Sequence, residues 1–161
     1  MTVVAYATIF SIVLDMTKKL SAARVAAWRG LLTIQARVVS RVEKQLAEAQ
    51  LPPLAWYDAL FALYEQPDQR LRMSELADKV LLSRSGLTRL VDKLESNGCL
   101  RREAVDTDKR GFHVSLTQKG IDLLRQMWPI YSDGIAQEFA NRLSNEEIDL
   151  LKTVFAKFNL P

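Results

Sequence analysis

Apolar residues recur at helical spacing along a stretch that begins near Ser21. The pattern is carried by side chains three, four or seven positions apart, which share one face of a helix: Val25, Trp28, Leu32, Val39, Val42 and Leu46. Leu51-Pro52-Pro53 ends it, because proline disfavours helical geometry in the residue before it. The spacing predicts a helix of about 30 residues. Since its apolar stripe is longer than one small domain covers, we expect it to lie along another long helix, such as one from a second subunit.

The next segments predict shorter helices, two of which are closely joined. Residues 54–65 keep the helical period until Gln66-Pro67-Asp68 breaks it. Residues 74–80 predict a short helix capped by Ser74, and residues 84–98 predict a second one that Asn97-Gly98 ends. The inward side chains of this second helix are Leu87, Leu90, Val91 and Leu94. Two helices joined by three or four residues indicate a helix-turn-helix unit, although a plain helical hairpin gives the same pattern.

The outward face of residues 84–98 suits a helix that enters the major groove of DNA. It is small near its start and then mixes hydroxyls with charges: Ser85, Gly86, Thr88, Arg89, Asp92 and Lys93. Small residues let the backbone approach the duplex, and hydroxyls and cations reach base edges and phosphates.

Two strands are predicted after this helix, at residues 99–105 and 112–117, around a turn at residues 106–111. In the second strand Phe112, Val114 and Leu116 are expected to face inward, and His113, Ser115 and Thr117 outward. Such a hairpin is a β-wing. Its tip carries Lys109 and Arg110, which suit the negative potential of a minor groove, whereas Asp108 is expected to fix the tip by accepting bonds from turn amides or from an arginine such as Arg110.

The C-terminal region predicts two further helices. From Gln118 the helical period resumes, with a kink expected near Pro129, and Ser144-Asn145-Glu146-Glu147 is a capping box that opens a last helix. These two helices and the first long helix together have more apolar surface than the small wing region can cover. We therefore expect them to pack across a two-fold axis in a homodimer. Two recognition helices would then face successive major grooves about 34 Å apart, which predicts a palindromic or near-palindromic operator.

Composition is that of one globular domain, and charge adds a modest signal. The chain has 161 residues, 48% of them hydrophobic, and a net charge of +3. Residues 70–113 hold ten Lys or Arg and seven Asp or Glu, so the whole positive excess lies there. A phosphate-facing surface would concentrate charge in this way, but an ordinary mixed-charge surface is an alternative interpretation. The single cysteine, Cys99, and the lack of a cleavable signal favour the reducing cytoplasm.

Residues 1–19 form an apolar N-terminal extension. Residues 3–14 are nearly all apolar but span only 12 positions, whereas a membrane helix needs about 20, so we expect no membrane partner. Two interpretations stay open: an extra helix buried against a partner subunit, or an upstream extension with Met16 as an internal start.

Residues 20–158 resemble the MarR family of bacterial winged-helix transcription regulators. The resemblance rests on RMSELADKVLLSRSGLTRLVDKLESNG, on the wing DTDKRGFHVSLTQKG, and on the long helices before and after them. It implies a homodimer with interlocked terminal helices, a recognition helix at residues 84–97 in the major groove, Arg110 in the minor groove and a wing held by Asp108. The proline often found before that aspartate is absent, and Cys99 stands where an aliphatic residue is common.

Pattern and resemblance together predict a mainly α fold with a small β-wing, a winged helix-turn-helix flanked by N- and C-terminal dimerisation helices. We assign residues 52–117 to the DNA-binding region and residues 20–51 and 118–161 to the dimerisation region. The expected function is a DNA-binding transcription regulator, a homodimeric repressor released by a small aromatic or anionic ligand. Its expected DNA contacts are Ser83, Arg84, Ser85, Gly86, Thr88, Arg89, Lys93, Lys109 and Arg110.

By the same resemblance, aromatic residues of three helices border a cleft for the ligand. The candidates are Trp28, Trp56, Tyr57, Phe61 and Trp128, with Arg24 or Arg29 to pair with a carboxylate. The alternative is that these rings are simply core.

Enzyme classes fit poorly, and we expect no cofactor. The only histidine, His113, has no second ligand at metal spacing, and the chain has no G-x-x-x-x-G-K-[ST] phosphate loop. Two alternatives to a ligand-released regulator stay open: a winged-helix module that binds protein, and a redox switch through Cys99, for which an apolar packed thiol is the competing interpretation.

Overall fold

The computed structural model describes residues 20–80, 84–105 and 108–158, with the backbone alone described at residues 84, 105 and 108–111. The expected N-terminal extension and Ser83 lie outside the described residues. The elements in chain order are α2 (Ala22–Glu48), α3 (Leu54–Tyr64), β1 (Arg70–Arg72), α4 (Met73–Lys79), α5 (Arg84–Ser96), β2 (Leu100–Val105), β3 (Asp108–Leu116), α6 (Gln118–Glu138), a 3₁₀ turn η1 (Ala140–Arg142) and α7 (Asn145–Ala156). The prediction of a mainly helical chain with a small β-wing is confirmed.

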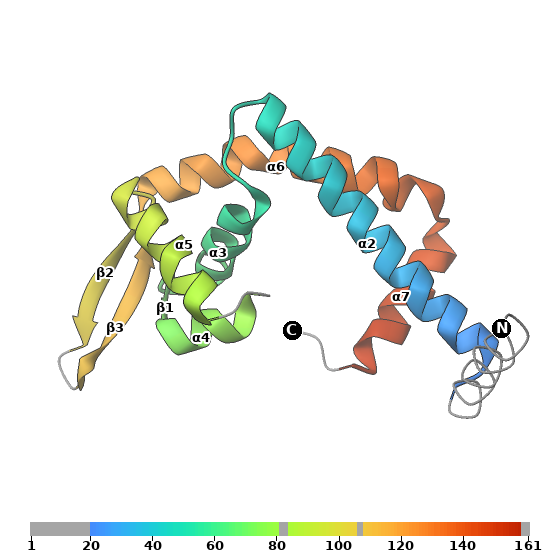
Figure 1. Cartoon of the computed structure of the whole chain (residues 1–161), viewed down its shortest axis with the longest axis horizontal. Coiled ribbons are helices and arrows are strands. Elements are labelled where there is room, and N and C mark those ends of the chain that lie inside the picture. The colour runs from blue at the N-terminus through green and yellow to red at the C-terminus, as the bar shows by residue number, and fades with distance from the viewer. Residues whose placement is uncertain (1–19, 81–83, 106–107, 159–161) are drawn as a thin grey trace, which may run out of the picture.

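The helices divide into a wing lobe and a helical arm, and α6 belongs to both (Figure 1). In the wing lobe, α3, α4 and α5 lie beside the sheet, whose two long strands project as the wing. In the arm, α2 crosses α6, and α7 turns back beneath α2. Because α6 starts directly after β3 and ends in the arm, one helix connects the wing to the region expected to dimerise.

The sheet has three antiparallel strands in the order β1-β3-β2, so β3 is its middle strand. β1 was not predicted from the sequence, and β3 begins at Asp108, which is paired with Val105, instead of at the predicted residue 112. The expected turn at residues 106–111 is therefore too long. Ser115 lies on the outward face of β3, as the alternation predicts, but it is buried instead of exposed, because Arg70 of β1 and Arg101 of β2 flank it in register.

One continuous core fills the wing lobe and reaches the crossing of α2 with α6. Its fully buried side chains include Leu60 and Leu63 of α3, Leu76 of α4, and Val114 of β3. At the crossing, Gly134 lies directly against Val42, where an added Cβ would collide with the valine side chain. The absence of a side chain at Gly134 thus sets how closely the arm helices approach.

Helix ends follow local side-chain chemistry, with one correction. Ser21 caps α2, and Ser144 with Glu147 forms the expected capping box of α7. Ser74 does not cap α4: the helix begins one residue earlier, and the Glu75 carboxylate accepts the Arg72 backbone N–H at 2.7 Å. Helix α6 is assigned without a break through Pro129.

Candidate nucleic-acid interface

Helix α5 separates into a buried face and an exposed face, as its sequence pattern predicts. Leu87, Leu90, Val91 and Leu94 are buried against the lobe. On the opposite side Ser85, Thr88, Arg89, Asp92 and Lys93 are exposed, and Gly86 is partly exposed. Arg84 is the first residue of α5, but its side chain lies outside the described part. The face expected to contact DNA is therefore open to solvent.

The end of α5 directs the chain straight into the wing. Gly98 adopts φ +70°, a left-handed conformation that glycine takes without a Cβ penalty. The Cys99 backbone N–H then donates to the Leu94 carbonyl at 2.9 Å, and the Gly98 N–H donates to the Glu95 carbonyl at 2.8 Å. These bonds satisfy the last carbonyls of the helix and place β2 immediately after it.

Arg102 of β2 ties the wing to α5, a link that the sequence analysis missed. Its guanidinium donates to Asp92 Oδ1 at 2.5 Å and to the Glu95 carboxylate, which also accepts the Arg102 backbone N–H at 3.0 Å. The same guanidinium lies 5.1 Å from the centre of the Phe112 ring. Burial alone would lower the pKa of Arg102, but the hydrogen bonds to Asp92 and Glu95 outweigh it and raise that pKa. Helix and wing are thus held at a fixed angle.

The start of β3, which carries the basic residues of the tip, lies at the outer end of the wing, away from α5 (Figure 1), and the side chains of residues 108–111 lie outside the described part. Asp108, Lys109 and Arg110 form the start of β3, so the expected role of Asp108 as a brace stays a prediction. The pairing of β2 with β3 shifts register between Ala104 and Val105, next to this tip. His113, expected to be exposed, is only partly so, because β1 and β2 flank it with Arg72 and Glu103.

The thiol of Cys99 is enclosed at the junction of α5 and β2. Its residue is 2% exposed, and burial raises the pKa of the thiol, an effect that Lys119 partly offsets. A reactive cysteine needs a lowered pKa and access to the oxidant. The environment of Cys99 therefore favours the packed thiol over the redox switch.

We expect Cys99 of the native protein to react slowly with a thiol reagent such as iodoacetamide, and DNA binding to be unchanged by peroxide. The rate at which Cys99 reacts is measured by labelling followed by mass spectrometry, with the urea-unfolded protein as the fully reactive control. Peroxide sensitivity that Cys99→Ser removes would restore the redox interpretation.

Three of the expected ligand-binding rings come together between α3 and α6. Tyr57 stacks on Phe61 at 5.5 Å and on Trp128 at 6.3 Å between ring centroids, beside a cavity of about 360 Å³. Burial is the main reason that the pKa of Tyr57 is raised to about 12, so its hydroxyl is neutral at physiological pH. The cavity is also lined by residues that the sequence analysis missed: Tyr64, Ile121, Leu124 and Arg125.

The other expected ligand residues lie elsewhere. Trp56 packs against the core, and Arg24, Trp28 and Arg29 belong to the outer half of α2 and do not line this cavity. The signal that could have identified Arg125 and Tyr64 is their helical spacing, each three positions from an aromatic residue that was chosen.

The described residues include neither a cluster suited to a metal ion nor a helix suited to cross a membrane. No group of three or more His, Cys, Asp or Glu side chains in the described ranges is arranged to hold a metal ion. Within the same ranges, every helix is too short or too polar to cross a membrane.

Comparison with known proteins agrees with this architecture. A family model described as MarR family matches residues 49–111. The HTH-type transcriptional regulator MhqR of Bacillus subtilis is 35% identical over 104 residues, covering 65% of this chain and 70% of MhqR. The transcriptional repressor MprA of Escherichia coli K12 is 34% identical over 99 residues, covering 62% of this chain and 56% of MprA.

A solved structure extends the similarity over most of the fold. The crystal structure of Sco3205, a MarR family transcriptional regulator from Streptomyces coelicolor, in complex with DNA, matches with a TM-score of 0.76 and 33% identity, covering 87% of this chain and 88% of Sco3205. On the strength of the shared fold, the amphipathic α5 with its wing, and these sequence identities, the chain belongs to the MarR family of transcriptional regulators.

Proposed function

We propose that this protein is a homodimeric repressor that binds a specific sequence of double-stranded DNA. The observation that carries the proposal is the Arg102 link, which holds the exposed polar face of α5 and the basic wing as one surface. That Sco3205 is solved in complex with DNA and that MprA is named a repressor support the same conclusion. Because its partner is DNA, the proposal places the protein in the cytoplasm.

The proposed contacts divide into base readout and backbone positioning. Ser83, Ser85, Thr88 and Arg89 would face base edges from the first turns of the recognition helix, where hydroxyls and a guanidinium have suitable donors and acceptors. A second group would contact phosphates or the minor groove: Arg84, Lys93, Lys109 and Arg110. Gly86 lets the helix backbone approach the duplex.

The arm supports a dimer through apolar surface that the single chain does not cover. Trp28 on α2 is 59% exposed, and Leu150 on α7 is 63% exposed. Phe158, just after the end of α7, is 68% exposed. Side chains of this size are costly to leave in water. We therefore retain residues 20–51 and 118–161 as the dimerisation region, residues 52–117 as the DNA-binding region, and a near-palindromic operator as the expected target.

We also propose that a small aromatic anion releases the repressor by binding between α3 and α6. The cavity offers the stacked rings of Tyr57, Phe61 and Trp128 and the cation Arg125. A ligand there weakens DNA binding only if it prefers a spacing of recognition helices that does not match the operator. The position of α6, which joins the wing to the arm, makes such a change of spacing the expected consequence.

The decisive experiment is a gel shift with the DNA upstream of the protein's own gene, at two salt concentrations. A repressor is expected to retard this fragment and to bind it more tightly than an unrelated fragment. Its affinity should fall steeply at the higher salt concentration. Failure to retard any DNA, with the protein folded and dimeric, would favour the protein-interaction module.

The wing contact can be tested separately with Arg110→Ala. Loss of one phosphate or minor-groove cation is expected to weaken binding to all sequences and to reduce the slope of log affinity against log salt by about one. Fluorescence anisotropy over a salt series gives this slope. Lys157→Ala, which removes an exposed cation at the end of α7, serves as the control with an unchanged slope. An unchanged slope in Arg110→Ala as well would contradict the assignment of the wing.

A further inference from the structure

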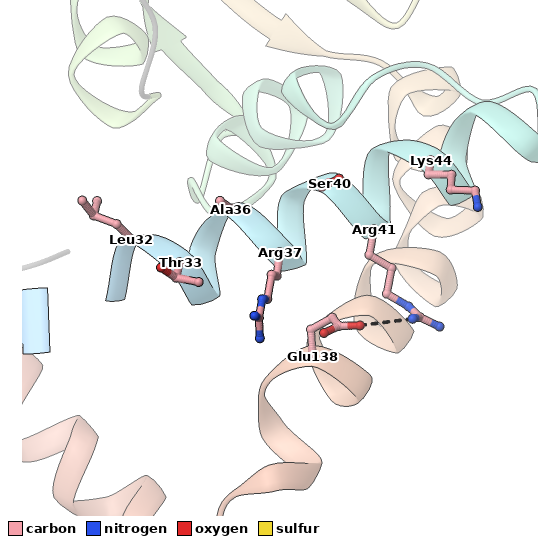
Figure 2. Close-up of a pocket in the computed structure, with 8 residues that line it drawn as sticks. All are labelled: Leu32, Thr33, Ala36, Arg37, Ser40, Arg41, Lys44 and Glu138. Carbon is pink, nitrogen blue, oxygen red and sulfur yellow. Dashed lines mark hydrogen bonds and ion pairs between the residues drawn. The ribbon is translucent and has the colours of Figure 1, made fainter. Parts of the chain in front are cut away.

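A second hollow lies on the arm, away from the aromatic cavity and from α5. It has a volume of about 640 Å³ and is bordered by one face of α2 and by the end of α6. Figure 2 shows the lining side chains, all but one of which come from α2. They are Leu32, Thr33, Ala36, Arg37, Ser40, Arg41, Lys44 and Glu138. Neither the aromatic cavity nor the proposed DNA contacts include any of these residues.

Three cations and a single carboxylate line this hollow. Arg37, Arg41 and Lys44 are four and seven positions apart, so they project from the same side of α2 over about 10 Å of helix axis. Glu138 is the only acid among the lining residues. The hollow therefore has an excess of positive charge, in a part of the chain for which the sequence analysis found no charge excess.

The three cations differ in how far they are already neutralised. Arg41 donates to Glu138 at 3.1 Å and also to the Gln137 side chain, so its guanidinium is fixed in place. Lys44 is highly exposed and reaches Glu48 only at 3.8 Å. Among the described contacts Arg37 has no ion pair, and Figure 2 shows its side chain extending into the same space as Glu138 and Arg41. Arg37 and Lys44 are thus available to an incoming anion beside a preorganised Arg41.

The other end of the hollow is aliphatic. Leu32 is 48% exposed and lies next to Ala36 along the lining, without an aromatic ring among the lining residues. The Thr33 hydroxyl donates its hydrogen to the Arg29 carbonyl at 2.8 Å, so it has no second proton for a ligand. The lining changes along α2 from apolar at Leu32 to cationic at Lys44.

We infer that this hollow binds a small aliphatic anion, with a carboxylate or phosphate head at Arg37, Arg41 and Lys44 and a hydrocarbon body on Leu32 and Ala36. Each part of this ligand matches a part of the lining: the cations attract the head, and the apolar end removes the chain from water. This site is separate from the aromatic cavity, and its existence does not depend on whether the protein binds DNA.

The test is calorimetric titration of the full chain with octanoate, with octyl phosphate as the second head group and 1-octanol as the neutral counterpart. Octanoate or octyl phosphate is expected to bind at least about tenfold more tightly than octanol. Amide NMR shifts caused by the ligand should cluster on residues 32–44, and the NMR signals of Trp128 in the aromatic cavity should not move.

The double variant Arg37→Gln, Lys44→Gln is expected to weaken binding of the anion at least about tenfold while leaving the Arg41–Glu138 pair intact. Its matched control, Lys152→Gln with Lys157→Gln, removes the same charge from α7 and should bind as the parent does. Equal affinity for octanoate and octanol would overturn the proposal, as would shifts confined to the aromatic cavity. A double variant that impairs self-association without altering anion binding would instead assign the hollow to the subunit interface.

Discussion

Replacing Gly120 with alanine is expected to lower the free energy of unfolding by about 3 kcal/mol. Gly120 is buried in the first turn of α6, where the helix passes against the junction of α5 and β2. An added Cβ would overlap the Cys99 carbonyl oxygen and lie 2.7 Å from Leu116 Cδ1. The carbonyl cannot move freely, because it accepts the Thr117 backbone N–H at 3.2 Å. Accommodating one methyl group thus requires α6 to move away from the wing.

Urea unfolding followed by circular dichroism measures this loss. Gln126→Ala is the matched control, because Gln126 is exposed on the same helix and its replacement should change stability by less than about 0.5 kcal/mol. A Gly120→Ala variant as stable as the control would show that α6 and the Cys99 carbonyl are not in close contact.

The main features of the wing lobe could be predicted from the sequence because each rests on local periodicity. The alternation of Leu87, Leu90, Val91 and Leu94 with polar positions defines both faces of α5, and Asn97-Gly98 marks its end. The capping box at Ser144 is likewise a short-range signal. Such patterns depend only on residues within a few positions of one another, so no tertiary knowledge was needed.

Features that depend on pairing between distant segments could not be predicted. β1 has only three residues, Arg70, Leu71 and Arg72, which is too short for a recognisable alternation. Ser115 faces the side that alternation assigns to solvent, yet it is buried because β3 acquires a neighbour on each edge. In the sequence Arg102 is one of several basic residues, and its pairing with Asp92 and Glu95 follows only from the packing of β2 against α5.

The arm shows the same limit for ligand sites. The family resemblance points to the aromatic residues of α3 and α6, but it also points to Trp28, which lies on the outer half of α2. The cationic hollow was missed altogether, since Arg37, Arg41 and Lys44 are ordinary exposed residues of a helix until Glu138 is brought beside them. Crossing of α2 and α6, set by Gly134 against Val42, creates that proximity.

Replacing Arg102 with methionine is expected to reduce affinity for operator DNA about tenfold or more, in excess of what the loss of one positive charge explains. Methionine keeps the apolar contact with Phe112 but cannot bond Asp92 or Glu95, which leaves two carboxylates without their cation at the base of the wing. Stability should fall by about 1–2 kcal/mol, less than for a fully buried pair, because Asp92 is 59% exposed. The larger effect is expected on DNA binding, since the angle between α5 and the wing is no longer fixed.

Arg101→Met separates the effect of geometry from that of charge. Arg101 is the preceding residue of the same strand, is 69% exposed and pairs only with Glu103 among the described ion pairs, at 2.6 Å. Both variants lose one positive charge, so their affinities for non-specific DNA should fall by similar amounts. For the operator, anisotropy titrations should show the Arg102 variant several-fold weaker than the Arg101 variant, with the ratio of specific to non-specific binding reduced only in the former. Equal losses in the two variants would mean that Arg102 contributes only its charge to DNA binding. The recognition helix would then be held to the wing by core packing, in which Leu94 and Leu100 take part.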